Sequence, residues 1–295
     1  MKKISNLLMM ALLTIGMGLT SCDEQLDNAV NPGVMPDVDD VTPTVEEVIK
    51  YGFKVTDLNG ADKTEAVTSL KMSNEDGTLV AEAEVSGGKI TIKAGKLSEI
   101  TAAADFWFEA EMIGGKPYVA KVNIDPATLS SETPMTLEMA TLGDVILSDG
   151  KFAAPSSTGT KVAMIAYLGS STGVEGYTHG LALALSDEST SGKAWLPAAA
   201  ACSDKNIYAA VTSASWRLPS KDQWDNMINA VGGYGALRDG FSGIAGASNL
   251  KSDRYWSSTE SGSGSAKSYD FGGGGGYWSD DNKSYDNRVR ACLAF

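Results

Sequence analysis

Residue types that build most catalytic and metal sites are scarce in this 295-residue chain. It holds one histidine and three cysteines, which leaves little for zinc ribbons or histidine-dependent chemistry. Basic residues are also few, with 24 Lys and Arg against 37 Asp and Glu and a formal net charge of −13. Because nucleic-acid binding needs basic patches, this balance argues against a nucleic-acid partner. The composition favours a binding or structural protein over an enzyme, with no catalytic residue, metal site or cofactor.

No apolar run reaches the roughly 20 residues of a stable membrane span. The run from Leu7 to Leu19 follows a basic start and ends at Leu19-Thr20-Ser21-Cys22. This ending resembles the lipobox of bacterial lipoproteins. The resemblance implies a signal peptide over residues 1–21 and a membrane anchor attached to Cys22. The alternative is an ordinary secretory signal followed by a chance cysteine.

Residues 22–44 are acidic and proline-containing, without hydrophobic periodicity, and predict a flexible tether. Its first residues, Asp23-Glu24, resemble the export signal of surface-exposed lipoproteins in some Gram-negative bacteria. That resemblance implies an outer-membrane lipoprotein exposed at the cell surface. A plain solvated linker is the other interpretation.

With Cys22 lipidated, Cys202 and Cys292 remain as an even pair in an oxidising compartment. We therefore expect a disulfide between them. It would close a loop of about ninety residues and stabilise the fold by roughly 4 kcal/mol. Two buried free thiols are the alternative.

From residue 45 to 140 the chain alternates polar and apolar residues in short runs separated by Asn-Gly, Asp-Gly and Gly-Gly pairs. This pattern predicts an antiparallel β-sandwich of about seven strands. The pattern resembles the fimbrillin-like and immunoglobulin-like stalk domains of surface lipoproteins. The expected strands cover 51–55, 69–72, 78–85, 89–93, 106–112, 118–124 and 135–139.

The sequence pattern changes at residue 141, after the run of short alternating segments. Residues 161–168 and 180–185 predict buried strands, and an Ala-rich stretch over 194–205 predicts a short helix with Cys202 on one face. A second helix is expected after Ser220, whose hydroxyl can cap it together with Gln223 in a capping box. One face of that helix would carry Trp224, Met227 and Ile228.

Three ordered motifs lie in this half: Trp216–Ser220, Tyr255–Glu260 and Arg288–Phe295. Together they resemble the C-type-lectin-like domain of the formylglycine-generating-enzyme subclass. The resemblance implies an α+β fold class, with an antiparallel β-sandwich followed by a C-type-lectin-like α+β domain over 141–295. Family members carry cysteines where Cys202 and Cys292 stand, which supports the disulfide. Catalysis of the formylglycine-generating type is the less favoured alternative, and the single histidine, His179, is expected to be a loop or packing residue and not a catalytic base.

The glycine excess, 32 residues in the chain, concentrates between these motifs. Of the 27 residues from 261 to 287, 22 are Gly, Ser, Asp, Tyr or Asn. A flexible low-complexity loop is one interpretation, although the segment's aromatic residues argue against it. A phosphate-binding loop fits worse, since no Lys-Ser or Lys-Thr follows the glycine run.

Those five residue types are also the products of changing the adenines of AAC or AAT codons. This bias resembles the variable region of the target proteins of diversity-generating retroelements, here about 256–295. In that family an error-prone reverse transcriptase scrambles adenines between fixed motifs, here Trp256–Glu260 and Arg288–Phe295. Lys267 and Lys283 depart from the pattern, because neither derives from such codons.

The resemblance implies a surface-displayed, adhesin-like binding protein whose ligand is an unknown protein or glycan on another cell, a phage or a host surface. Tyr269, Tyr277, Trp278 and Tyr285 would dominate binding, although Tyr269 and Trp278 could instead belong to the framework. Acidic side chains would favour basic or hydroxyl-rich ligands. An invariant fimbrial or adhesin tip subunit is the alternative function. The predicted ligand contacts are Ser261, Ser263, Ser265, Ser268, Asp270, Gly272, Gly274, Gly276, Tyr277, Ser279, Asp280, Asp281, Asn282, Ser284, Tyr285 and Asp286.

Overall fold

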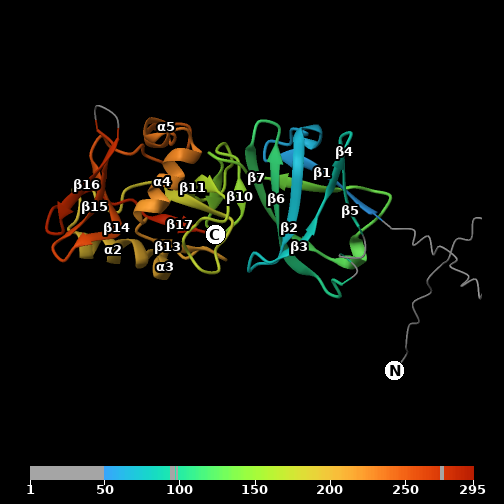
Figure 1. Cartoon of the computed structure of the whole chain (residues 1–295), viewed down its shortest axis with the longest axis horizontal. Coiled ribbons are helices and arrows are strands. Elements are labelled where there is room, and N and C mark those ends of the chain that lie inside the picture. Colours follow the sequence, from blue (N-terminus) through green and yellow to red (C-terminus); the bar gives the residue numbers. More distant parts are fainter. Residues whose placement is uncertain (1–49, 94–96, 98, 273–275) are drawn as a thin grey trace, which may run out of the picture. The chain divides into compact units, whose positions relative to one another are not determined.

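The computed structural model describes residues 50–93, 97, 99–272 and 276–295 (Figure 1). The predicted signal peptide, the tether, Cys22 and Gly274 lie outside this part of the chain. Residues Glu47–Phe295 belong to one compact unit. No helix among the described residues is both long and apolar enough to cross a membrane.

Two four-stranded sheets occupy the first half of this unit, with strand orders β4-β5-β1-β8 and β3-β2-β6-β7. Strand β1 pairs antiparallel with β5 but parallel with β8, so the first sheet is mixed. Short 3-10 helices lie at Thr64–Ala66 and Pro126–Thr128. The strands are β1 Lys50–Asp57, β2 Val67–Ser73, β3 Leu79–Glu82, β4 Glu84–Ser86, β5 Lys89–Lys93, β6 Ala104–Met112, β7 Lys116–Ile124 and β8 Met135–Met139.

These two sheets share one hydrophobic core. It includes Phe53 of β1, Leu70 of β2, Phe108 of β6 and Leu137 of β8, each at most 2% exposed. The alternation of polar and apolar residues in the sequence therefore places one face of each strand in the core. Each of the seven expected runs overlaps an observed strand, and the run at 78–85 overlaps two, β3 and β4.

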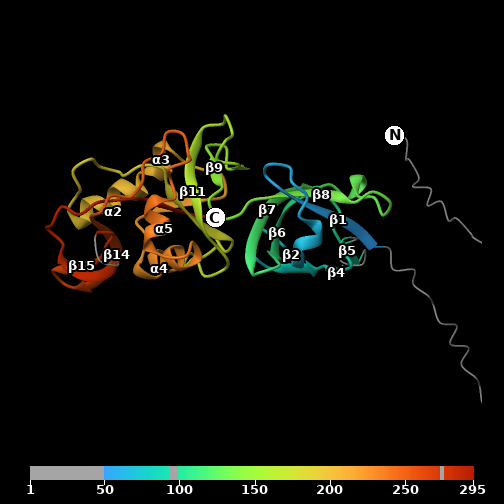
Figure 2. The ribbon, with the colours of Figure 1, turned by 90° about the horizontal axis from the view of Figure 1, so that it is seen from above.

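The second half is organised around a six-stranded sheet in the order β10-β9-β11-β12-β17-β13. Strands β9 and β11 of this sheet are seen beside helices α3 (Lys205–Tyr208) and α5 (Tyr234–Asp239) in Figure 2. Strand β17, close to the end of the sequence, lies inside the sheet, antiparallel to both β12 and β13. The strands are β9 Val145–Leu147, β10 Phe152–Ala153, β11 Lys161–Leu168, β12 Gly180–Ala184, β13 Ser215–Arg217 and β17 Cys292–Ala294.

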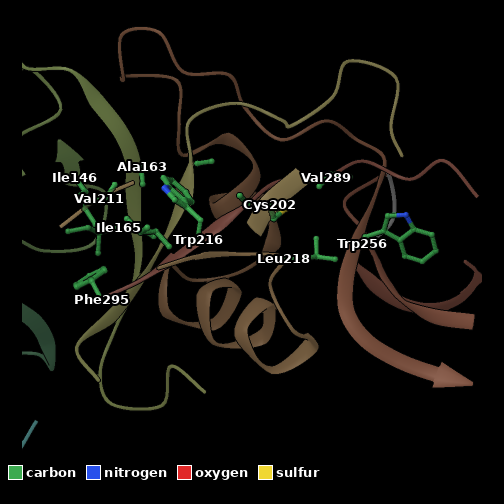
Figure 3. Packing of buried hydrophobic residues seen from close by; sticks show 14 of the residues in the cluster. Ile146, Ala163, Ile165, Cys202, Val211, Trp216, Leu218, Trp256, Val289 and Phe295 are labelled. Carbon is green, nitrogen blue, oxygen red and sulfur yellow. The ribbon is translucent and has the colours of Figure 1, made fainter. Parts of the chain in front are cut away.

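This sheet is buried on both faces. Along β12, Ala182 and Ala184 belong to one hydrophobic cluster, whereas Leu181 and Leu183 belong to the cluster on the other face. Figure 3 shows the first cluster, in which Ile165 and Phe295 gather near Trp216. Burial on both faces explains why the predicted strands 161–168 and 180–185 read as nearly continuous apolar runs.

Helices cover the sheet: α2 Trp195–Ser203, α3 Lys205–Tyr208, α4 Lys221–Ala230 and α5 Tyr234–Asp239. Helix α4 begins as predicted. Ser220 Oγ accepts a hydrogen bond from the Gln223 amide at 3.2 Å, and Gln223 Oε1 accepts one from the Ser220 amide at 2.8 Å. Trp224, Met227 and Ile228 are buried together, which confirms the predicted apolar face.

The predicted α+β fold class with a C-type-lectin-like domain over 141–295 is wrong. The described residues are mostly β, with seventeen strands in four sheets. The helices are short because Gly232-Gly233 and Gly240 interrupt helical structure around α4 and α5. The Gly- and Ser-rich segment, for which a flexible loop was one interpretation, supplies two strands of another sheet, Ser265–Asp270 and Tyr277–Asn282.

Cys202 and Cys292 are free thiols, which departs from the predicted disulfide. They belong to different hydrophobic clusters, Cys202 with Trp216 and Cys292 with Met164. Burial raises the pKa of Cys292 to about 12 and raises that of Cys202 as well, so both thiols stay protonated at neutral pH.

His179 is a packing residue. Its ring is buried, stacks on Trp107 with the centroids 4.1 Å apart, and places Nδ1 2.8 Å from Glu109 Oε1. Phe295 also stacks on Trp107, with the centroids 6.1 Å apart. The single histidine therefore belongs to the contact between β6 and the second half of the unit.

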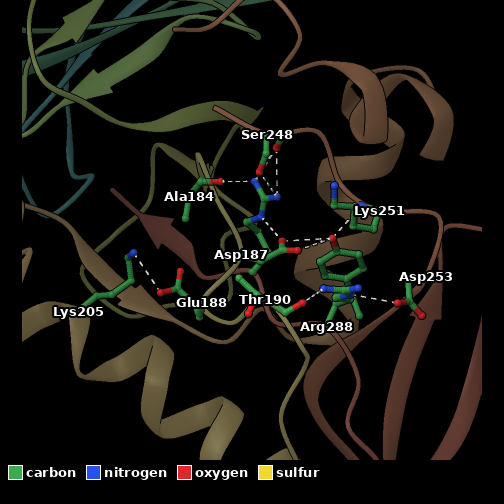
Figure 4. A network of polar contacts seen from close by, with 11 residues as sticks. Ala184, Asp187, Glu188, Thr190, Lys205, Ser248, Lys251, Asp253 and Arg288 are labelled. Atoms are coloured by element: carbon green, nitrogen blue, oxygen red, sulfur yellow. Dashed lines mark hydrogen bonds and ion pairs between the residues drawn. The ribbon is translucent and has the colours of Figure 1, made fainter. Parts of the chain in front are cut away.

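A buried arginine connects the six-stranded sheet to a polar network that includes Ala184, Asp187 and Ser248. Figure 4 shows these three residues of the network. Arg290 has no exposed surface and donates to Asp187 Oδ1 at 2.7 Å and to the Ala184 carbonyl at 2.9 Å. Asp187 also accepts from the Tyr255 hydroxyl, at 3.1 and 3.2 Å. Two residues earlier, Arg288 pairs with the half-exposed Asp253 at 3.0 Å.

These two arginines predict a contrast in stability. Arg290→Met leaves the Asp187 carboxylate buried without its cation, so we expect a loss of about 3–5 kcal/mol of unfolding free energy. Arg288→Met leaves Asp253 solvated, and a loss of about 1 kcal/mol or less is expected. Urea unfolding followed by fluorescence measures both. Equal losses in the two variants would contradict this account of the network.

Candidate ligand-binding surface

The segment predicted to bind ligand forms most of a three-stranded antiparallel sheet in the order β14-β15-β16. Its strands are β14 Arg254–Gly262, β15 Ser265–Asp270 and β16 Tyr277–Asn282, drawn in orange to red in Figure 1. β15 and β16 pair over six residues without a register shift, from Ser265 opposite Asn282 to Asp270 opposite Tyr277. The Gly- and Ser-rich composition therefore coexists with regular strand pairing.

Both ends of this segment are held by backbone hydrogen bonds to each other. The Trp256 amide donates to the Arg288 carbonyl at 3.0 Å, and the Arg288 amide donates to the Arg254 carbonyl at 2.8 Å. Trp256 is fully buried, and its indole nitrogen donates to the Lys193 carbonyl at 2.7 Å. The fixed motifs around the segment thus form one closed base from which residues 257–287 extend.

The sixteen predicted contact residues do not share one environment. Ser268 and Asp281 are buried, and Ser265, Asp270, Gly272, Gly276 and Ser279 are partly buried. Gly274 lies outside the described residues. The remaining eight, here called the exposed set, are Ser261, Ser263, Tyr277, Asp280, Asn282, Ser284, Tyr285 and Asp286.

Asp281 is the centre of a buried polar cluster within the sheet. Its carboxylate accepts hydrogen bonds from Ser268 Oγ at 2.7 Å and Asn287 Nδ2 at 2.8 Å, and pairs with Arg254 Nη1 at 2.7 Å. The Asp281 side chain is 5% exposed. These contacts join all three strands, so Ser268 and Asp281 stabilise the framework and do not face a ligand.

The aromatic residues of the segment also fall into a packed pair and an exposed pair. Tyr269 is buried against Phe271, and Trp278 packs on it edge to face, with centroids 5.0 Å apart. The Trp278 indole donates to Asp225 of α4 at 2.9 Å. By contrast, Tyr277 and Tyr285 are 52% and 56% exposed. Of the four aromatic residues expected to dominate binding, only these last two present their rings to solvent.

Gly276 is a framework position for a steric reason. A Cβ atom there would lie 2.8 Å from Cγ of Tyr234, closer than real Cβ atoms approach other groups. Any side chain at this position requires the Tyr234 ring to shift. The glycine is therefore explained by close packing between the segment and α5.

The two lysines that depart from the codon pattern also have structural partners. Lys267 pairs with Asp280 across β15 and β16 at 2.7 Å. Lys283 pairs with Glu260 at 2.6 Å, and its ammonium lies 4.7 Å from the centre of the Trp195 ring. Lys267 therefore connects β15 to β16, and Lys283 connects the end of β16 to β14 and α2.

Ion pairing offsets much of the acidity of this surface. Hydrogen bonding from Lys267 lowers the pKa of Asp280. Burial raises the pKa of Asp270, but the Gly272 amide, Tyr277 and Arg254 outweigh it, so the net pKa is lowered. These carboxylates stay charged at neutral pH with cations beside them. Within the described residues, no group of three or more potential metal ligands is brought together.

Composition did not reveal the framework role of Asp281, nor the parts of Arg254 and Asn287 in its cluster. The pairing register of β15 and β16 could have revealed that Asp281 faces inward. If β15 and β16 form a hairpin, Ala266 lies opposite Asp281, and the buried Ala266 identifies the inward-facing side.

Two adjacent aspartates test the distinction between buried framework residues and the exposed set. Asp281→Asn removes the charge that pairs with Arg254, and we expect a loss of about 3 kcal/mol of unfolding free energy. Asp280→Asn removes an exposed carboxylate, and no change in unfolding midpoint is expected. Urea unfolding of the two single variants measures the difference. A midpoint for Asp281→Asn equal to that of the wild type would contradict the framework role.

Comparison with known proteins gives little further guidance. No protein-family model and no curated protein matches the chain. Among solved structures, the chain is similar to a fimbrial protein from Bacteroides ovatus ATCC 8483, with a TM-score of 0.43 and 11% sequence identity. The alignment covers 83% of this chain and 69% of that one.

Proposed function

We propose that the protein is a cell-surface, adhesin-like binding protein that contacts its ligand through the exposed set of residues on the β14-β15-β16 sheet. The observation that carries this proposal is the closed base of the segment, where Trp256, Arg288 and Arg254 exchange backbone hydrogen bonds. A segment held at both ends can vary at its exposed positions without loss of the core. Tyr277 and Tyr285 supply contact area, and Ser and Asn supply hydrogen bonding, the mixture found in antibody binding loops.

The surface location follows from the lipobox-like ending at Cys22, which predicts a lipid anchor in the outer membrane. The acidic tether over residues 22–44 would hold the binding unit away from that membrane. The ligand is a protein or glycan on another cell, a phage or a host surface. No nucleic-acid partner is proposed, because the chain carries a net charge of −13.

We further propose that a retroelement diversifies the exposed set. Codon-compatible residues make up the whole exposed set, although buried residues such as Ser268 and Asp281 are codon-compatible too. The departures Lys267 and Lys283 lie outside the exposed set and form ion pairs with Asp280 and Glu260. An invariant adhesin tip is the competing function, and it gives no reason for the bias toward residues derived from AAC and AAT codons.

Oxidase activity of the formylglycine-generating type is not proposed. That chemistry uses reactive cysteines, and thiolate is the reactive form. Cys202 and Cys292 are both buried, and burial raises both pKa values. A structural role for the two thiols accounts for their positions.

The coding DNA tests diversification directly. We expect the glycine codons of residues 272–276 to end in C or T, and a nearby template repeat to differ from the gene only at adenines. Sequencing of the locus in sibling clones measures both. Glycine codons ending in A or G, without a repeat or a reverse-transcriptase gene nearby, would refute diversification and leave the invariant adhesin.

Display libraries test the binding surface. One library varies the exposed set among Gly, Ser, Asp, Asn and Tyr, and a matched library varies Ala266, Ser268, Tyr269 and Asp281 with the same residues. Hen egg-white lysozyme, a basic folded protein, serves as the probe. We expect folded binders from the first library, enriched in Tyr at 277 and 285, and few folded members from the second. Loss of folded protein in the first library would contradict the proposal.

A further inference from the structure

A pocket of about 440 Å³ lies between α2, the β13–α4 connection and β14. This volume falls within the range of about 300–1,000 Å³ that is usual for small-molecule sites. None of the lining residues that the structure describes carries a carboxylate, although the chain has 37 acidic residues. Its polar lining consists of Ser203, Arg217, Ser220, Gln223 and Ser258.

Arg217 differs from the other four arginines of the chain. All five lie among the described residues, and the other four pair with aspartates within 4 Å: Arg238, Arg254, Arg288 and Arg290. Within the described part of the chain, Arg217 has no such carboxylate. Its single hydrogen bond there is a long one, 3.4 Å from Nη2 to Ser215 Oγ, and its Nε is buried without a partner.

A buried guanidinium nitrogen without a partner loses hydration that nothing in the fold replaces. The planar guanidinium presents five donors in a fork that matches a carboxylate. The strand register fixes its place, because Arg217 lies opposite Cys292 in the six-stranded sheet. The cation is therefore held at the pocket with most of its donors unused.

Hydroxyl groups line the same pocket. Ser220 Oγ accepts from the Gln223 amide, which leaves its own proton free to donate. Ser203 Oγ donates to the Ala200 carbonyl at 3.1 Å and keeps its acceptor capacity. Ser258 is exposed, and the structure gives its hydroxyl no hydrogen bond among the described residues. The side-chain amide of Gln223 already makes hydrogen bonds within the fold: its Oε1 accepts from the Ser220 backbone amide, and its Nε2 donates to the Thr172 carbonyl.

Small apolar groups complete the lining, from Gly173, Ala199 and Leu218. The pocket thus combines one unpaired cation, several hydroxyls and a small apolar surface. We propose that it binds an acidic sugar, whose carboxylate pairs with Arg217 and whose ring hydroxyls meet the serines. A small oxyanion such as sulfate could pair with Arg217, but it would leave most of the pocket empty and the serine hydroxyls without partners.

This site is separate from the proposed binding surface. All of its lining residues lie outside the 261–287 segment. Arg217, Leu218 and Ser220 belong to the Trp216–Ser220 motif, and Ser258 belongs to the Tyr255–Glu260 motif. Ser258 lies on β14, the strand that leads into the segment. A constant acidic-sugar site beside a diversified surface would bias every variant toward ligands that carry acidic glycans.

Titration of the protein with D-glucuronate, followed by calorimetry or ligand-detected NMR, tests the site. D-glucose is the matched sugar without the carboxylate. We expect saturable glucuronate binding and at least about tenfold weaker binding of glucose, because a hydrogen bond to a charged group is worth about that factor or more. Equal affinity for the two sugars, or no glucuronate binding, would overturn the proposal.

Variants assign the site to Arg217. Arg217→Met should weaken glucuronate binding to the level of glucose, whereas Arg238→Met, at a partly exposed arginine paired with Asp239 and outside the pocket lining, should leave it unchanged. Ser258→Ala changes an exposed hydroxyl and should weaken binding several-fold at an unchanged melting temperature, which keeps the test valid if Arg217→Met fails to fold. Unchanged binding in Ser258→Ala together with unchanged binding in a folded Arg217→Met would refute the site.

Displacement of glucuronate by equimolar sulfate would refute the sugar assignment. Neither result would affect the library experiment on the exposed set.

Discussion

The placement of residues 288–294 is the constraint on which the second half of the molecule depends. Within seven residues this stretch pairs with Arg254 and Trp256, buries Arg290 beside Asp187 and supplies β17 between β12 and β13. A strand inside a sheet needs partners on both sides, so the sheet is incomplete until this stretch docks. Because it lies near the end of the sequence, its contacts with β12 join segments more than one hundred residues apart. The fold therefore depends on long-range pairing.

The same placement explains why the Gly- and Ser-rich segment can be ordered. Closing an excursion of about 30 residues costs roughly 3 kcal/mol of chain entropy, apart from a constant term. Buried contacts that do not involve the exposed set offset this cost: the Trp256 indole, the Asp281 cluster and the Tyr269–Phe271 pair. The exposed set can then change without altering the interactions that close the excursion. Stability and contact surface are carried by different residues of one short segment.

Local patterns in the sequence predicted local structure well. Alternation placed the strands of the first half, and the capping box placed the start of α4. The fold class was wrong because it was inferred from motifs, and motifs do not show how strands combine into sheets. The parallel pairing of β1 with β8 is one such arrangement, since it joins residues about eighty positions apart. The disulfide expectation had the same weakness, because the sequence gives the number of cysteines but not the hydrophobic cluster that each one joins.

Register also changes the electrostatic character expected of the binding surface. The four aspartates of the segment suggested a preference for basic ligands, but pairing supplies three of them with cations: Asp270 and Asp281 with Arg254, and Asp280 with Lys267. Among the described residues, Asp286 has no cation within 4 Å. Long-range attraction is further screened beyond about 8 Å at physiological salt. Recognition at the exposed set therefore depends on hydroxyl, amide and aromatic contacts at short range, and its specificity should depend on shape and hydrogen bonding more than on net charge.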